Sequence, residues 1–146
     1  MKRAAITVGL FCVLLATVCA QDKNRFAVAG VNEREVEAFF TAFQEAVAKG
    51  QKQRVTAMIS YPISPTLASG RTVKVSNSAR FVKLYDQIFD DRFKKLIAET
   101  EFKDLWAKFS GVATPRGEIW INGVVFNSKS DEYEIKITSI NGPIER

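Results

Sequence analysis

The stretch Ser110-Gly-Val-Ala-Thr-Pro-Arg-Gly-Glu-Ile-Trp-Ile-Asn122, in the C-terminal third of this 146-residue chain, decides the fold class. Its pattern predicts a strand, a tight turn and a second strand. Proline at the second position and glycine at the fourth position of residues 114–117 suit a type I turn. The segments before it read as helices whose apolar faces need cover. We therefore expect the sheet that contains this stretch to be the scaffold of the core.

The residues that follow predict further strands. Asn122-Gly123 is the strongest kind of short hairpin signal and offers a rival position for the turn. We favour the turn at residues 114–117, with Gly123 as a bulge in a strand that continues to Phe126. A polar loop at residues 127–131 then leads to Tyr133-Glu-Ile-Lys-Ile-Thr138, which alternates strictly between apolar and polar residues. Together these segments predict an antiparallel meander.

Upstream, helix signals begin at Asn32. This residue is a good N-cap, and Glu35 stands three positions later, as in a capping box. Lys49 and Gly50 supply a terminal cation and the glycine that commonly follows a helix. Between these ends, apolar residues recur at helical spacing, at Val36, Phe39, Phe40, Phe43 and Val47. The pattern predicts a long amphipathic helix.

Three more helical segments are expected. Residues 51–59 form a short second helix, which Tyr61-Pro62 stops because proline disfavours the helical conformation in the residue before it. Residues 72–75 alternate like a short strand. Caps at residues 76–78 then start a helix whose apolar stripe is Phe81, Leu84, Tyr85 and Ile88. Asp90-Asp91 caps a last short helix, which turns Phe93, Leu96 and Ile97 inward.

The first twenty residues have the layout of a secretory signal peptide. Lys2 and Arg3 are basic, residues 4–17 carry no charge, and Ala20 offers a small residue for cleavage. An apolar run of about 14 to 17 residues is short for the roughly 20 that a membrane-spanning helix requires. We expect a cleaved signal peptide at residues 1–20, a loose lead-in at residues 21–31 and a single domain at residues 32–146, exported to the periplasm or secreted.

Composition narrows the possible functions. With 47% hydrophobic and 25% charged residues, the chain has the balance of an ordinary globular protein. Cys12 and Cys19 both lie in the predicted signal peptide, so we expect no disulfide and no thiol chemistry after cleavage. Loss of Lys2 and Arg3 leaves 19 of the 21 basic residues against 16 acids, a scattered net charge of +3. We therefore expect no nucleic-acid partner, and no membrane span once the signal is removed.

Helices followed by a meander predict an α+β fold, in which N-terminal helices pack on a curved antiparallel sheet. Three parts of the sequence resemble those of a known family: Met58-Ile-Ser-Tyr-Pro-Ile63, Phe81-Val-Lys-Leu-Tyr-Asp-Gln-Ile-Phe89, and Ser110-Gly-Val with Arg116-Gly-Glu-Ile-Trp-Ile121. They resemble the nuclear-transport-factor-2-like superfamily, and within it the exported, uncharacterised bacterial branch. The resemblance spans nearly all of residues 32–141 and implies a cone-shaped domain. It also implies a possible homodimer, because homodimers are common in that superfamily.

Chemistry is harder to assign. Enzymes of the resembled superfamily use His, Asp or Tyr in the pocket of the cone, and this chain contains no histidine. An aspartate base with tyrosine donors remains conceivable, but the pattern puts no aspartate inside the cone. The chain also lacks the residue spacings of metal sites and of phosphate loops. We therefore assign no catalytic residue, no metal ligand and no cofactor.

A few residues are candidates for a ligand-binding pocket or an interface wall. If Ile119 and Ile121 face one way, their neighbours share the other side of the strand and could line a polar wall. The alternative is that Trp120 packs in the core or in an interface, while Glu118 lies at a solvated strand end. Two tyrosines add hydroxyl groups at apolar positions, although such groups usually bond to the backbone. The candidates are Tyr61, Tyr85, Glu118, Trp120 and Asn122.

Three functions fit these residues. The first is an exported, non-enzymatic domain that binds a small apolar ligand or a protein partner. The second is a small enzyme of isomerase, dehydratase or cyclase type, which uses a carboxylate with Tyr61 or Tyr85. The third is a periplasmic inhibitor or immunity-type protein that blocks a partner enzyme. A filled interior would favour a protein partner over a small ligand.

Overall fold

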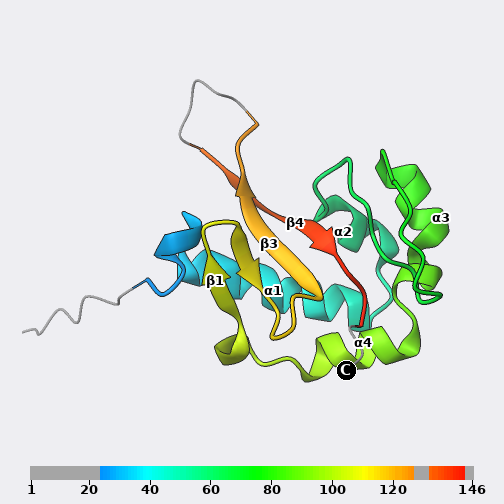
Figure 1. Ribbon diagram of the computed structural model, residues 1–146, viewed down its shortest axis with the longest axis horizontal. Helices are drawn as coiled ribbons and strands as arrows, with labels where there is room; N and C mark the ends of the chain where they lie inside the picture. The colour runs from blue at the N-terminus through cyan, green and yellow to red at the C-terminus, as the bar shows by residue number, and fades with distance from the viewer. Residues whose placement is uncertain (1–23, 127–131, 144–146) are drawn as a thin grey trace, which may run out of the picture.

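The computed structural model describes residues 24–126 and 132–143, so the predicted signal peptide and the loop at residues 127–131 lie outside it. The helices in this range are η1 (Ala27–Ala29), α1 (Glu33–Ala48), α2 (Lys52–Ala57), α3 (Ser78–Ile88), α4 (Asp91–Glu99) and η2 (Phe102–Asp104). The strands are β1 (Trp106–Lys108), β2 (Gly111–Ala113), β3 (Ile119–Val124) and β4 (Glu134–Ile140). Helices pack against the antiparallel sheet (Figure 1), which confirms the predicted α+β fold. Among the described helices, none has the length and apolar character needed to span a membrane.

Three of the helices begin at the capping residues that the sequence predicts. The side chain of Asn32 accepts hydrogen bonds from first-turn N–H groups of α1, and Asn77 and Asp90 do the same for α3 and α4. These bonds satisfy donors that have no partner inside the helix. α1 ends at Lys49 and Gly50, where Gly50 has a φ of 61° that suits glycine. Local sequence signals therefore set the limits of these helices.

The cap of α1 has an addition that the sequence does not signal. The hydroxyl of Tyr133, just before β4, accepts a hydrogen bond from the Asn32 N–H at 3.2 Å and donates one to Glu35 Oε2 at 2.7 Å. In a capping box the glutamate itself reaches this N–H. Here the tyrosine lies between the two groups, and its bond to Glu35, with burial, raises the pKa of Tyr133. The N-terminus of the first helix is thus bonded to the start of the last strand.

The sheet is an antiparallel meander in the order β1-β2-β3-β4. The predicted turn joins β2 to β3, and the Gly117 N–H donates to the Thr114 carbonyl at 2.8 Å. The rival turn at Asn122-Gly123 does not form, because both residues lie inside β3. β1 is a strand that the sequence pattern did not single out.

Gly123 has a different role from the predicted one. We expected a bulge there in a strand reaching Phe126, but Gly123 pairs with Ile135 in regular register and β3 ends at Val124. A Cβ atom at position 123 would lie 2.9 Å from the ring of Tyr133, which is too close. The glycine thus makes room for the tyrosine that bonds to α1. The register shift between β3 and β4 falls instead after Trp120.

The second helix is shorter than predicted. α2 ends at Ala57, because the backbone after it pairs with β4. The Ile137 N–H donates to the Met58 carbonyl at 2.8 Å, and Ile59 and Ile137 form a parallel bridge. The strand predicted at residues 72–75 is reduced to isolated bridges, which join Val75 to Ile63 and Thr72 to Thr66. After α2, pairing with a distant strand replaced the local helical preference, whereas residues 72–75 pair only with the nearby residues 63–66.

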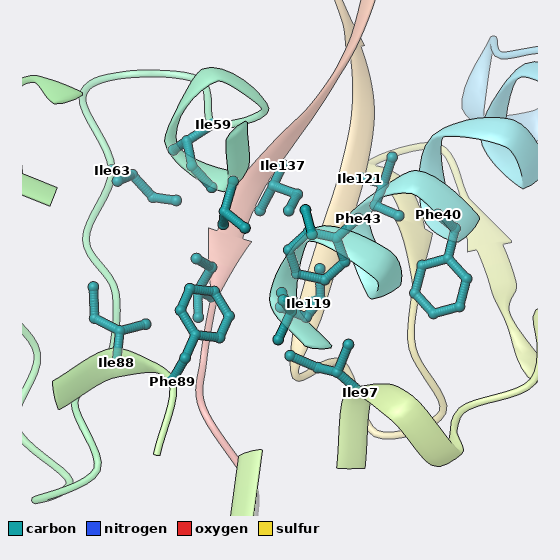
Figure 2. Close-up of a cluster of buried hydrophobic side chains, with 14 of the residues drawn as sticks. Phe40, Phe43, Ile59, Ile63, Ile88, Phe89, Ile97, Ile119, Ile121 and Ile137 are labelled. Atoms are coloured by element: carbon teal, nitrogen blue, oxygen red, sulfur yellow. The ribbon is translucent and has the colours of Figure 1, made fainter. Parts of the chain in front are cut away.

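Large apolar side chains fill the space between the helices and the sheet. Figure 2 shows phenylalanines from the helical part of the chain gathered against isoleucines of the strands. The side chains that are almost completely buried include Phe40, Phe43, Phe89, Ile97, Ile119, Ile121 and Ile137. Burial of Ile119 and Ile121 shows which face of β3 points into the core, a choice that the sequence left open. Each such side chain contributes on the order of 1.5–3 kcal/mol to folding.

Arg25 fixes the segment before α1 to the rest of the domain. Its guanidinium carbon contacts the rings of both Phe26 and Phe102, 4.4 and 4.5 Å from their centroids. It also donates to three backbone carbonyls of the η2 segment and pairs with Glu33. Phe26 is buried. The described part of the expected lead-in is therefore packed, although its sequence shows no period.

Candidate functional site

Glu118 lies in the β2–β3 turn, one residue before β3 begins. Only 2% of its surface is exposed. Its Oε2 atom accepts hydrogen bonds from Thr114 Oγ1 at 2.7 Å and from the Arg116 N–H at 3.1 Å. The Thr114 hydroxyl oxygen in turn accepts from the Ile119 N–H at 3.1 Å. The alternative of a solvated strand end is therefore wrong, because the carboxylate is held inside the turn.

A cleft of about 750 Å³ opens beside this turn. Arg92, Lys95 and Leu96 of α4 line one side, and Pro115, Arg116 and Glu118 line the other. The lining carries both charges, and Glu118 already accepts two hydrogen bonds from its own turn. Such a cleft can hold a polar group, but it brings neither candidate tyrosine to the carboxylate.

Trp106 and Trp120 form an aromatic pair on the side of the sheet that faces away from the core. Their rings meet edge to face, with centroids 5.3 Å apart and an interplanar angle of 81°. The Trp106 indole N–H donates to the Thr114 and Pro115 carbonyls at 3.0 and 3.2 Å, and 38% of Trp106 is exposed. The Lys108 ammonium lies 4.7 Å from the centroid of Trp120. The Trp106 indole is thus held by hydrogen bonds and the Trp120 indole contacts it and Lys108, while part of the Trp106 surface stays open.

Polar residues of β3 and β4 continue this surface. Asn122 lies opposite Lys136, and Trp120 lies opposite Ser139. Side chains directly opposite in a sheet share one face, so these residues flank the indoles. We call the set Trp106, Lys108, Trp120, Asn122, Lys136 and Ser139 the tryptophan face. It has an aromatic centre and a polar rim, which is the usual plan of a protein interface.

The amide of Asn122 is used locally within this face. Its Nδ2 atom donates to the Ser110 carbonyl at 3.3 Å, and its Oδ1 atom accepts from the Gly123 N–H at 3.0 Å. The Lys136 ammonium pairs with Glu134 at 3.0 Å and donates to the Ala57 carbonyl. These bonds fix the polar rim against the strands.

The two candidate tyrosines lie among the helices instead. The Tyr61 hydroxyl donates to the Thr56 carbonyl at 3.1 Å, and burial raises its pKa. Tyr85 is buried with its ring 4.9 Å from that of Phe89. Burial, with a smaller effect of Asp86, raises the pKa of Tyr85 to about 12. In the part of the chain that the structure describes, the Tyr85 hydroxyl has no hydrogen-bond partner.

The structure therefore separates the five candidates into three places. Trp120 and Asn122 belong to the tryptophan face, Glu118 belongs to the turn, and both tyrosines pack with the core. Sequence reasoning missed Trp106 and Lys108. Their signal was the alternation in Trp106-Ala-Lys108 just before a turn at Phe109-Ser110, which puts both side chains on one side of a short strand.

Metal ligands do not gather in residues 24–126 and 132–143: no three carboxylate side chains there are close enough to hold an ion. Comparison with family models gave no match, and comparisons with curated proteins and with solved structures gave none either. The class of this protein is therefore described by its fold and its surface alone. This is an α+β domain with helices on one face of an antiparallel sheet and paired tryptophans on the other.

Proposed function

We propose that this chain is an exported binding domain that recognises a protein partner through the tryptophan face. The observation that carries the proposal is the Trp106–Trp120 pair, which is partly exposed and in which the Trp106 indole N–H is held by hydrogen bonds. Tryptophan is enriched among the residues that dominate binding energy in protein interfaces. An indole fixed before binding loses little conformational entropy when the partner arrives.

A protein partner fits better than a small apolar ligand held inside the domain. The space between helices and sheet is occupied by buried phenylalanine and isoleucine side chains. A ligand of that kind would have to displace well-packed side chains, at a cost of several kcal/mol. The outer surface of the sheet needs no such rearrangement.

The proposal includes membership of the nuclear-transport-factor-2-like superfamily. Support comes from the parallel bridge between Ile59 and Ile137 and from the order of helices before an antiparallel meander. Support for export comes from the sequence of residues 1–20, with its basic start and uncharged run. A homodimer through the same face is one form that the partner could take.

The other two candidate functions would use the same residues in different ways. An inhibitor or immunity-type protein is the special case in which the partner is an enzyme. An isomerase, dehydratase or cyclase would need a carboxylate beside a tyrosine. Glu118 bonds to Thr114 and Arg116, whereas Tyr61 bonds to Thr56. We therefore rank partner binding above catalysis.

The test is recovery of the partner with matched variants. The tagged chain is cross-linked in its own producing cells, purified and examined by quantitative mass spectrometry. We expect a stoichiometric partner with the wild type, and about 30-fold less with Trp120→Ser, since loss of such a residue costs at least about 2 kcal/mol. Val28→Ser is the control, because Val28 is also exposed but lies in η1, outside the tryptophan face.

Thermal unfolding of each variant separates loss of binding from loss of fold. Trp120→Phe keeps an aromatic ring and should retain part of the binding. Equal recovery with wild type and Trp120→Ser would refute the assignment of the face, and so would the absence of any stoichiometric partner. A partner that is a second copy would appear as cross-links between identical peptides.

A further inference from the structure

Basic residues are concentrated in the middle of the chain. Residues 46–85 contain seven lysines and arginines and no aspartate or glutamate. Because the expected mature chain has a net charge of only +3, the rest of it is net acidic. The excess of positive charge therefore lies in and around α2 and α3. A concentration of one sign of charge attracts partners of the opposite sign.

Three of these seven cations already have acidic partners. Lys49 and Arg54 both pair with Glu45. Lys52 pairs with Asp86, which is the one acid of α3. The other four cations are exposed and form no ion pair with any residue in the described part of the chain. These four are Arg71, Lys74, Arg80 and Lys83.

Two of the four unpaired cations line a groove along α3. The groove has a volume of about 460 Å³. Residues three or four positions apart lie on one face of a helix, so Arg80, Lys83 and Leu84 border the groove together. Leu84 is only partly exposed and gives the groove an apolar wall. We call the set Asn77, Ala79, Arg80, Lys83 and Leu84 the α3 groove.

The segment before α3 carries the other two unpaired cations along the same helix. The Ala68 N–H donates to the Gln87 carbonyl at the C-terminal end of α3, whereas Asn77 caps its N-terminal end. The chain between these points must therefore run the length of the helix. Figure 1 shows α3 at one edge of the domain with this segment beside it. Arg71 and Lys74 thus strengthen the positive field around the α3 groove.

We propose that the α3 groove binds an acidic segment of a protein partner. Arg80 and Lys83 pair with carboxylates of the segment, and an apolar side chain of the segment contacts Leu84 inside the groove. Charge complementarity of this kind speeds the encounter and fixes the orientation of the partner. The proposal rests on residues of α3 and does not depend on the tryptophan face.

Two other anionic partners fit the groove less well. Single-stranded nucleic acid binds where bases can stack on aromatic side chains, and no aromatic residue lines the α3 groove. A lipid surface takes up apolar side chains that project into it. Here the apolar side chain, Leu84, lies in a concave wall and is partly buried. A protein side chain can enter such a groove, whereas a flat bilayer surface cannot.

Fluorescence anisotropy with a short labelled peptide of glutamate and leucine tests the proposal. The protein is purified as its cells produce it, and mass spectrometry identifies its N-terminus, because Lys2 and Arg3 would add charge to an uncleaved chain. We expect binding at low ionic strength that weakens as salt is added, since salt screens the exposed cations. A peptide with glutamine for glutamate, and one with serine for leucine, should both bind much more weakly.

Variants of equal charge identify the residues. Arg80→Gln with Lys83→Gln should lower the affinity for the glutamate–leucine peptide at least about tenfold. Lys49→Gln with Arg54→Gln is the matched control, because it removes the same charge from cations that already pair with Glu45. It should change the affinity much less. Thermal unfolding of each variant shows whether the fold is kept.

Ala79→Glu blocks the groove without removing a cation. Ala79 is exposed in the first turn of α3, where a carboxylate is favourable to the helix. The variant should therefore fold as the wild type does, yet the new carboxylate occupies the groove and repels an acidic segment. We expect it to lower the affinity at least as much as the Arg80→Gln and Lys83→Gln pair does.

Several outcomes would overturn the proposal. One is the absence of peptide binding at low salt. Another is an equal loss of affinity in the two glutamine pairs, because net charge alone would then explain the binding. A third is tighter binding of labelled single-stranded DNA, or of vesicles of phosphatidylcholine with phosphatidylglycerol, that the Arg80→Gln and Lys83→Gln pair abolishes. The groove would then belong to a nucleic acid or to a lipid surface and not to a protein segment.

Discussion

The hydroxyl of Thr114 donates a 2.7 Å hydrogen bond to the carboxylate of Glu118, and both side chains are buried. This pair closes the turn that joins β2 to β3. The same turn supplies the carbonyls of Thr114 and Pro115 that hold the Trp106 indole. A change at Thr114 should therefore affect the turn first and the tryptophan face after it.

Replacement of Thr114 by valine should lower the free energy of unfolding by about 2–4 kcal/mol. Valine has nearly the shape of threonine but removes one of the donors to Glu118 and the acceptor of the Ile119 N–H. Thr114→Ser keeps the hydroxyl and should lose less. Urea unfolding followed by tryptophan fluorescence measures both, and equal stability of the two variants would argue against a structural role for the hydroxyl.

Tyr85→Phe should leave the domain equally stable or about 1 kcal/mol more stable near neutral pH, because it removes a buried hydroxyl without a partner. Tyr61→Phe is the control. It breaks the hydrogen bond to Thr56 and should lower stability by about 1 kcal/mol. Thermal and urea unfolding measure both effects, and equal losses in the two variants would contradict the interpretation.

Tyr85 also predicts a dependence on alkaline pH. The folded-state pKa, raised to about 12 by burial, lies above the unfolded value of about 10, so the folded state keeps the proton longer. The contribution of Tyr85 to stability is therefore complete below pH about 10 and is lost as the pH rises toward about 12. Urea unfolding across this range should show a smaller decline for Tyr85→Phe than for the wild type. Parallel declines would count against the assignment to Tyr85.

Gly111→Ala should be much more harmful than Gly70→Ala. Both glycines have positive φ, at 130° and 81°, which alanine adopts at a cost of about 1–2 kcal/mol. At position 111 the added Cβ would also lie 2.7 Å from the Ile121 carbonyl oxygen, whereas nothing lies within 4 Å at position 70. We expect Gly111→Ala to cost at least about 3 kcal/mol, since the strands must move apart. The melting temperatures of the two variants test this prediction, and equal losses would contradict it.

Arg25→Lys should loosen the segment before α1. Lysine cannot reproduce the planar fork that donates to the η2 carbonyls, nor the contacts of the guanidinium with the rings of Phe26 and Phe102. We expect a loss of about 1–2 kcal/mol and faster amide hydrogen exchange at residues 26–31. Arg54→Lys is the control, because Arg54 contacts the exposed side chains of Gln51 and Glu45. Unchanged exchange at residues 26–31 would show that Arg25 does not hold this segment.

Features with a local cause could be predicted from the sequence. Asn32, Asn77 and Asp90 cap helices because their side chains reach N–H groups only two or three residues away. The turn at residues 114–117 follows from its proline and glycine. The alternation grouped Ile119 and Ile121 on one side of β3, and the structure shows that this side is the buried one.

Features set by distant segments could not be predicted in the same way. α2 stops early because β4, some eighty residues later, takes up its backbone groups. Gly123 accommodates Tyr133, and nothing near Gly123 in the chain signals this. Alternation also grouped Glu118 with Trp120, but the carboxylate turns back to Thr114 because the turn offers it two donors. The partner of Trp120 is Trp106, which only strand pairing brings near.

The hydroxyl of Tyr133 also has a consequence for the time order of folding. A chain made from its N-terminus completes α1 about a hundred residues before the tyrosine that finishes its cap is available. The same holds for the segment after α2, whose partner is β4. Both ends of the domain must therefore be present before the first helix and the sheet are secured. A partly made chain lacks this closure until its last strand is free.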